Sequence, residues 1–201
     1  MANTPIATGI IGLGRSGWGI HADVISRLPD RFQVAAVYDP INERAEEAAD
    51  KLSCTACASV EALLADPSVE LVVVASPNRF HATQAVMALE AGKHVLCEKP
   101  FAVTLDEVDA MIAAAERTGK VLTEAFMYRH HPQTLKAQAI VNSGALGKLQ
   151  FIRGAFTFTL NREGNFRLQK EMGGGSLWDV GCYPVNFART LVGAEPLEVF
   201  G

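Results

Sequence analysis

The sequence has no apolar segment long enough to cross a bilayer, and Met1-Ala2-Asn3-Thr4-Pro5 holds no basic residue ahead of an apolar stretch. These absences predict a chain without membrane span or secretory signal, and hence a cytoplasmic location. Clusters of lysine or arginine are also missing, and the formal net charge is -4. Because nucleic acids and anionic membranes are bound through basic patches, we expect neither as a partner.

Cysteine is scarce, with four residues in the whole chain. Such thiols are expected to be reduced rather than joined in a disulfide framework. Cys54-Thr55-Ala56-Cys57 has the spacing of a redox pair or of half a zinc site, but no second Cys/His pair at metal spacing accompanies it. We therefore interpret Cys54 and Cys57 as small buried side chains and expect no metal site.

Internal repeats and low-complexity segments are absent too, so the organisation of the chain follows from its length and its apolar pattern. The 201 residues are 49% hydrophobic and 20% charged, which excludes a disordered chain and allows a large core. That length predicts one large domain, or one full domain with part of a second.

Glycine is placed at three informative positions near the start. The apolar run Ile6 to Ile11 leads directly into Gly12-Leu13-Gly14-Arg15-Ser16-Gly17, a Gly-x-Gly-x-x-Gly turn. In such a turn the first glycine allows a tight bend, the second lets backbone approach a pyrophosphate, and the third permits close packing of the following helix. The amino end of that helix attracts the anion.

An acidic residue stands where a dinucleotide site needs one. Phe32 to Tyr38 is a second apolar run, and it ends at Asp39, whose carboxylate is placed to accept hydrogen bonds from both hydroxyls of an adenosine ribose. The alternative is a glycine-rich turn followed by an ordinary solvated aspartate. The two signals together favour a dinucleotide-binding site.

The first 124 residues alternate short apolar runs with helical patterns, which predicts an α/β domain with a parallel sheet covered on both faces, a Rossmann domain. The uninterrupted apolarity of 71–75 predicts a strand at the sheet centre. Thr104 and Glu107 predict a capping box, and Gly119 ends the helix that begins there. We expect strands at 6–11, 32–38, near 55, 71–75, 95–97 and 121–124, and helices at 16–28, 42–52, 60–65, 80–91 and 105–118.

A second domain is expected over 125–201, where the pattern changes. A helix at 133–143 precedes strand-like residues over 149–160, a glycine-rich loop at 173–175, another helix, and a last strand-like stretch at 197–201. The domain would be the first part of an α+β open-sheet domain.

Glu98-Lys99-Pro100 follows a short strand, at the carboxyl edge where open α/β sheets bind ligands. A lysine there can donate a hydrogen bond to a substrate oxygen and stabilise charge that develops on it. Pro100 favours an extended conformation for Lys99. The alternative is a surface lysine without a catalytic role.

Asp179 and Tyr183 stand four residues apart and would share one face of a helix. Tyrosine is a poor acid or base at neutral pH, but a neighbouring lysine cation makes proton transfer feasible, so Lys99 and Tyr183 form a candidate pair. The alternative interpretation has Tyr183 as a packing aromatic and Asp179 as a helix cap, and spacing alone does not decide between them.

Four motifs together resemble the Gfo/Idh/MocA oxidoreductase family: Gly12-Leu13-Gly14, Ala75-Ser76-Pro77-Asn78, Glu98-Lys99-Pro100 and the segment 174–184. The Asp-x-x-x-Tyr spacing, with Phe166-Arg167, is similar to the branch that contains glucose-fructose oxidoreductase, dihydrodiol dehydrogenase and xylose dehydrogenases. The resemblance implies an NAD(P)-dependent dehydrogenase or reductase that acts on a sugar, cyclitol or related diol.

The resemblance also implies roles for individual residues. Lys99 and Tyr183 would carry proton transfer and substrate orientation, with Asp179 assisting. NAD is the expected cofactor, because Asp39-Pro40 would repel the 2′-phosphate of NADP and supplies no cation; Arg15 and Arg44 keep NADP as an alternative. The predicted cofactor-binding residues are Gly12, Gly14, Arg15, Ser16, Gly17, Asp39, Arg44, Ser76, Pro77, Asn78, His81, Glu98 and Lys99.

The chain departs from the family in length, since members continue beyond this point to complete an open sheet that binds substrate and packs against another subunit. We therefore expect a truncated second domain, and a homo-oligomer where that sheet is complete. Two further functions remain open: an NAD-binding protein without catalysis, and an NAD-dependent glycosidase.

Overall fold

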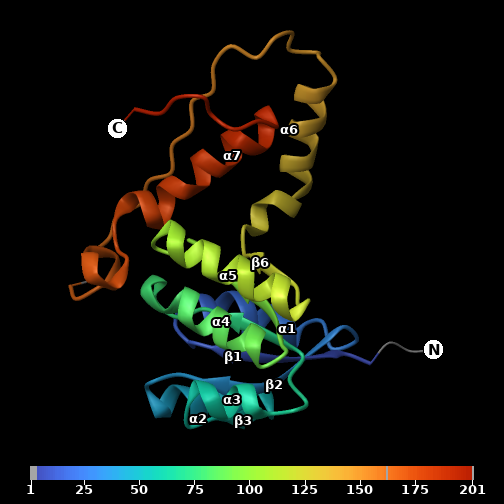
Figure 1. Ribbon diagram of the computed structural model, residues 1–201, viewed down its shortest axis with the longest axis vertical. Coiled ribbons are helices and arrows are strands. Elements are labelled where there is room, and N and C mark those ends of the chain that lie inside the picture. Colours follow the sequence, from blue (N-terminus) through green and yellow to red (C-terminus); the bar gives the residue numbers. More distant parts are fainter. Residues whose placement is uncertain (1–3, 162, 201) are drawn as a thin grey trace. The chain divides into compact units, whose positions relative to one another are not determined.

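The computed structural model describes residues 4–161 and 163–200, which form two compact units, Met1–Ala125 and Phe126–Gly201. Unit 1 is a three-layer α/β domain with one six-stranded sheet in the order β3-β2-β1-β4-β5-β6 (Figure 1). All neighbouring strands pair in parallel, which confirms the Rossmann architecture. The strands are β1 Ile6–Ile11, β2 Phe32–Tyr38, β3 Thr55–Ala56, β4 Leu71–Val74, β5 His94–Cys97 and β6 Leu122–Glu124.

Helices cover both faces of this sheet, because each crossover between parallel strands carries one. One face packs against α1 and α2, with a core that includes Ile10, Ile25, Val34, Ala45 and Val73. The opposite face packs against α3, α4 and α5. The helices of unit 1 are α1 Asp23–Ser26, α2 Asn42–Leu52, α3 Val60–Ala65, α4 His81–Glu90 and α5 Leu105–Thr118.

The central strand was predicted from its uninterrupted apolarity, and Val72, Val73 and Val74 of β4 are fully buried. Helix α5 has the predicted bounds. The hydroxyl of Thr104 accepts a hydrogen bond from the Glu107 N–H, the Glu107 carboxylate accepts from the Thr104 N–H, and Gly119 is left-handed with φ of 66°. These local signals fix both ends of the helix.

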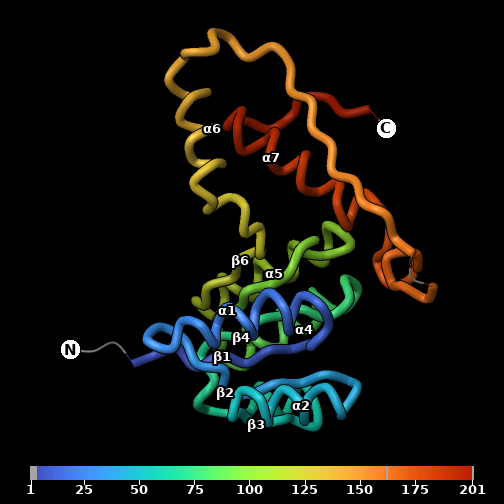
Figure 2. Tube along the Cα trace, turned by 180° about the vertical axis from the view of Figure 1, so that it is seen from behind, coloured from blue at the N-terminus to red at the C-terminus, as the bar shows by residue number. Residues whose placement is uncertain are grey.

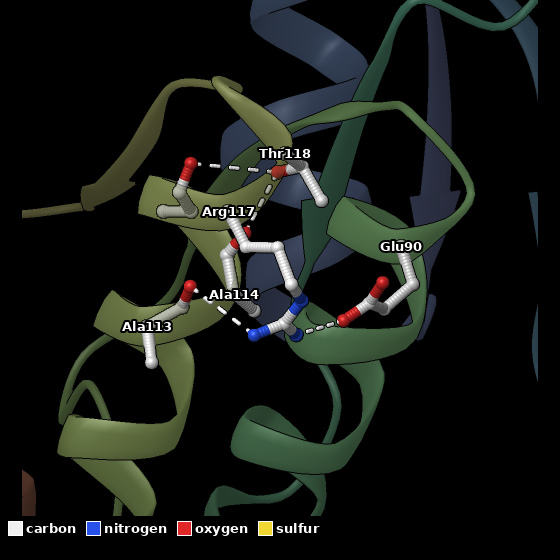
Figure 3. Close-up of polar contacts among 6 residues, drawn as sticks. Glu90, Ala113, Ala114, Arg117 and Thr118 are labelled. Carbon is white, nitrogen blue, oxygen red and sulfur yellow. Dashed lines mark hydrogen bonds and ion pairs between the residues drawn. The ribbon is translucent and has the colours of Figure 1, made fainter.

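Helices α4 and α5 lie side by side on one face of the sheet, and an ion pair joins their carboxyl ends (Figure 3). The Arg117 guanidinium forms an ion pair with Glu90 and also donates to the Ala113 carbonyl. The hydroxyl of Thr118 donates to the Ala114 carbonyl over 2.8 Å. The exposed Arg117–Glu90 ion pair contributes about 0–1 kcal/mol to the stability of the fold. Apolar packing therefore holds the two helices together.

Two helical segments have π-helical hydrogen bonding, which the sequence did not indicate. The helix expected at 16–28 begins with a π-helical segment, Gly17–Ala22, before α1. The second segment is Leu177–Gly181, directly before α7. π-helical turns are frequent at functional sites.

Unit 2 consists of helices, short 3₁₀ turns and long irregular segments. Helix α6 (Pro132–Asn142) packs against α7 (Cys182–Val192), and the Gln138 side chain donates to the Thr190 carbonyl over 3.1 Å. The 3₁₀ turns are Met127–His130, Phe166–Leu168 and Lys170–Met172. Figure 2 shows the irregular chain that leads from α6 toward α7.

The strands expected over 149–160 and 197–201 were wrong for the residues that the structure describes, and Gly201 lies outside them. Residues 149–160 form no strand, and Phe151 and Phe158 are 77% and 53% exposed. Leu197 to Phe200 are likewise irregular and exposed. A strand is stabilised by hydrogen bonds to the backbone of a neighbouring strand. The described residues of unit 2 contain no strand that could pair with these segments.

Among residues 4–161 and 163–200, no helix combines the length and the apolar character that a membrane span requires.

Candidate active site

The predicted cofactor residues of unit 1 lie on loops that leave the same edge of the parallel sheet. The glycine turn follows β1, Asp39 follows β2, Ser76-Pro77-Asn78 follows β4, and Glu98-Lys99 follows β5. In an open parallel sheet this carboxyl edge is where ligands bind. The topology therefore brings these four sequence-distant loops to one edge.

Each glycine of the turn has a distinct surrounding. Gly12 has φ of +90°, a conformation that strains other residues, and an added Cβ would lie 2.8 Å from the Ala75 backbone. At Gly17 an added Cβ would lie 1.8 Å from the Gly12 carbonyl oxygen. At exposed Gly14 an added Cβ would meet nothing within 4 Å. The open space at Gly14 fits the close approach of a pyrophosphate.

Asp39 is 3% exposed and joins the first two loops. Its Oδ2 accepts a hydrogen bond from the Leu13 N–H over 2.7 Å, and its Oδ1 accepts from the Ile41 N–H over 3.0 Å. The exposed Arg44 guanidinium lies 3.7 Å from Oδ1. The carboxylate is thus held as an acceptor at the end of β2, where Arg44 forms an ion pair with it.

Ser76 and His81 organise the loop after β4. The Ser76 hydroxyl donates to the Gln84 side chain over 2.6 Å. The His81 ring is fully buried, with Nδ1 2.8 Å from the Pro100 carbonyl and Nε2 2.9 Å from the Ser76 carbonyl. Burial lowers the pKa of His81, against the opposing effect of those two carbonyls and Glu98. His81 therefore supports the loops after β4 and β5, and its ring is not presented as a ligand contact.

Glu98 and His21 form a buried pair, and Glu98 also contacts the backbone of Lys99. His21 Nε2 lies 2.7 Å from Glu98 Oε1, and Glu98 Oε2 accepts a hydrogen bond from the Lys99 N–H over 3.2 Å. Burial alone would raise the pKa of Glu98, but the hydrogen bond and charge of His21, together with Lys99, hold it below its ordinary value. Glu98 is therefore an ionised carboxylate at neutral pH.

His21 and Gln84 were missed by sequence reasoning. His21 is separated from Glu98 by 77 positions, and Gln84 lies on the helix after the Ser76 loop. One weak signal was available: His21 is a histidine within the first turns of the helix that follows the glycine turn.

In unit 2, Asp179 and Tyr183 have different neighbours. Asp179 lies in the π-helical segment, and its Oδ2 is 2.9 Å from Nε of Arg167. Tyr183, in the first turn of α7, packs its ring against Phe126 and Phe156, with centroid distances of 5.4 Å and 5.2 Å. Asp179 is thus an ion-paired carboxylate, and Tyr183 belongs to an aromatic cluster.

Arg167 is itself held firmly. Its N–H donates to the Asn165 side chain over 3.0 Å, its carbonyl accepts from the Gly175 N–H over 2.9 Å, and its guanidinium stacks on Phe166. Loop 165–175 therefore fixes the ion pair with Asp179.

Cys54 and Cys57 are half-buried rather than buried, and neither has a reactive environment. Burial raises the pKa of Cys54 to about 11, with a further contribution from Cys57, and burial also raises the pKa of Cys57. Reactive thiols need a lowered pKa. Within the residues that the structure describes, no three His, Cys, Asp or Glu side chains are grouped as metal ligands.

Comparison with known families gives two matches. Residues 6–126 match the model of the oxidoreductase family with an NAD-binding Rossmann fold, and residues 134–201 match the GFO/IDH/MocA C-terminal domain. The D-xylose 1-dehydrogenase (NADP(+)) 2 of Haloferax volcanii is 39% identical over 183 residues, which cover 90% of this chain and 56% of that protein. It belongs to the branch expected from the motifs.

Solved structures are similar over most of the chain. The aldose-aldose oxidoreductase from Caulobacter crescentus, complexed with glycerol, matches with a TM-score of 0.89 and 30% identity over 96% of this chain and 59% of that one. A 3-ketoreductase from Actinomadura kijaniata, in complex with NADP and TDP-benzene, matches with a TM-score of 0.88 and 31% identity over 94% and 57%.

Variants of that 3-ketoreductase have a lysine replaced by alanine and a tyrosine replaced by phenylalanine. The two positions are as far apart in its sequence as Lys99 and Tyr183 are here. The chain spans between 51% and 59% of the length of the first curated relatives that it matches. With both family models matched, the chain belongs to the Gfo/Idh/MocA oxidoreductase family.

Proposed function

We propose that this chain carries the cofactor-binding and catalytic residues of an NAD(P)-dependent dehydrogenase or reductase. Its substrate would be a secondary alcohol, or the matching carbonyl, of a sugar, cyclitol or related diol. The observation that carries this proposal is the gathering of the glycine turn, Asp39, the Ser76 loop and Lys99 at one edge of a parallel sheet. The sugar-related names of the relatives support the substrate class.

The residues present fit a dinucleotide. The space at Gly14 suits a pyrophosphate, and the fixed Asp39 carboxylate suits a ribose hydroxyl. Gly12, Arg15, Ser16 and Gly17 would surround the phosphates, and Pro77, Asn78 and Glu98 would hold the nicotinamide half. The bound cofactor would supply hydride transfer, which none of the side chains can perform.

Lys99 and Tyr183 supply the proton chemistry in this proposal. The Lys99 ammonium would donate a hydrogen bond to the reacting oxygen and stabilise negative charge there. The Tyr183 hydroxyl would give or take the proton at that oxygen. Asp179, ion-paired with Arg167, would accept a hydrogen bond from a substrate hydroxyl and orient it. Phe126 and Phe156 support Tyr183 through ring contacts.

NAD is the preferred cofactor in this proposal, although relatives include proteins named for or solved with NADP. The Asp39 carboxylate would repel a 2′-phosphate, and Pro40 offers no positive charge. Arg44 is the residue that would support NADP, but it lies 3.7 Å from Asp39, which offsets its charge.

The proposal is tested by following nicotinamide absorbance with a panel of polyols and aldoses and with either cofactor. We expect turnover with NAD. Lys99→Ala and Tyr183→Phe should each reduce turnover by about 10²-fold, the usual contribution of acid-base catalysis, and leave NAD binding intact. Unchanged turnover in both variants would refute these roles. Nucleotide binding without turnover of any substrate would support the non-catalytic alternative.

A further inference from the structure

A buried chain of contacts leads from the helix of the glycine turn to the backbone of Lys99. His21 lies in the π-helical segment Gly17–Ala22, and its side chain is 10% exposed. Its Nε2 is 2.7 Å from Oε1 of Glu98, whose side chain is 12% exposed. The second carboxylate oxygen of Glu98 accepts from the Lys99 N–H. His21 is thus connected to Lys99 through one carboxylate.

The backbone around Lys99 is fixed from other directions as well. The Glu98 N–H donates to the Val74 carbonyl over 2.8 Å, which extends the β4–β5 pairing. The carbonyl of Pro100 lies 2.8 Å from the His81 ring. Both flanking residues are thus anchored, and the Glu98 carboxylate accepts the hydrogen bond of the Lys99 N–H itself.

An ionised carboxylate in this position depends on its partners. Glu98 is 9% exposed, and a buried charge without compensation is costly. Removal of the His21 ring would leave Glu98 with fewer compensating contacts. The carboxylate would then take up a proton more readily or turn toward water, and either change weakens its bond to the Lys99 N–H.

We propose that His21 is a positioning residue that holds Lys99 in place through Glu98. This inference rests on the proposed function, because Lys99 acts there as the group that stabilises the reacting oxygen. His21 would contact neither substrate nor the reacting atoms, and its effect would be on turnover rather than on nucleotide affinity. A small error in placing a catalytic group can cost as much as about 10²-fold in rate.

Kinetics of three variants test the proposal. His21→Ala should lower kcat about 10-fold with substrate KM and NAD affinity changed by less than about threefold, since chemistry suffers more than binding when a catalytic group is misplaced. His21→Gln should recover most of the loss, because its amide N–H can donate to Glu98. His94→Ala is the matched control: His94 accepts a hydrogen bond from the Val121 N–H at the opposite edge of the sheet, and its loss should leave kcat unchanged.

A double-mutant cycle and a titration show whether His21 acts on Lys99 through Glu98. If His21 acts through Glu98, the effects of His21→Ala and Glu98→Gln on kcat will not add. In the wild type and in His21→Ala, ¹³C-labelled Glu98 can be titrated by NMR, and its pKa should be higher in the variant whether or not turnover is measured. If His21→Ala does not fold, His21→Phe replaces it in both experiments, because its ring fills the same space but donates no hydrogen bond to Glu98.

The outcomes separate this inference from the proposed function. Unchanged kcat in His21→Ala, additive effects in the cycle, or an unchanged pKa of Glu98 would overturn the role of His21 in an active enzyme. A wild type that binds NAD but turns over no substrate would overturn the proposed function, and with it the kinetic role of His21, while the titration would still report on the His21–Glu98 pair.

Discussion

Three glycines within residues 14–19 provide a sharp test, because an added methyl group would meet backbone at Gly17 but nothing within 4 Å at Gly14 or Gly19. At Gly17 the new Cβ would lie 1.8 Å from the carbonyl oxygen of Gly12, far inside ordinary van der Waals contact. The obstacle is backbone of the turn, which cannot swing away as a flexible side chain can. Gly17→Ala should therefore force the helix and the turn apart.

The expected loss of stability is at the upper end of the range for overpacking, about 3 kcal/mol. With a urea m-value of roughly 2 kcal/mol/M, the unfolding midpoint would fall by roughly 1.5 M. Far-UV circular dichroism in a urea titration measures this change. NAD affinity should fall together with stability, since the turn that is displaced is the one that we propose to bind the phosphates.

Two substitutions in the same segment serve as controls. Gly19 is exposed and helical, and its added Cβ would meet nothing within 4 Å, so Gly19→Ala should keep NAD affinity and gain about 0.5–1 kcal/mol. Gly14→Ala should keep wild-type stability but weaken NAD binding at least about tenfold, because its methyl group would occupy the space left for the cofactor. A Gly17→Ala protein as stable as Gly19→Ala would refute the packing argument.

Further predictions concern single contacts. Thr104→Ala removes the hydroxyl that caps α5 and should cost about 1 kcal/mol in a urea titration, whereas Thr104→Ser should cost little. Asp39→Ser removes the charge that opposes a 2′-phosphate and frees Arg44 from its ion pair, so the ratio of kcat/KM for NADP to that for NAD should rise about tenfold or more; an unchanged ratio would contradict the role of Asp39. Cys54, with its pKa raised to about 11, should alkylate slowly at pH 8 and faster as pH rises toward that value, because only the thiolate reacts. Fast labelling of Cys54 at pH 7, followed by mass spectrometry, would show that burial does not protect it.

Local signals explain why much of unit 1 could be predicted from the sequence. Thr104, Glu107 and Gly119 mark both ends of α5 within the helix itself, and the apolar run 71–75 reflects burial on both faces of β4. The parallel pairing of the strands follows from the alternation of strand and helix. The carboxyl-edge position of Asp39 and Lys99 needed only the ends of two strands.

Other features depend on contacts that a single sequence does not contain. The residues over 149–160 have the composition of a strand, but that preference is realised only beside another strand. The π-helical segments carry one residue more per hydrogen-bonded turn than the α-helical pattern assumes. The pairing of His21 with Glu98 and of Arg167 with Asp179 joins distant segments, and nothing near either residue indicates the partner.

The bond network of the sheet edge has a consequence for protein engineering. Asp39 ties together the loops after β1 and β2, whereas the His81 ring ties together the loops after β4 and β5. Since different side chains brace the proposed adenosine end and the proposed reaction end, coenzyme choice should be open to redesign around residues 39–44 without rebuilding the loops after β4 and β5. Conversely, exchanging the loop after β4 for that of another enzyme would require residues 76, 81 and 100 to be transplanted as one block.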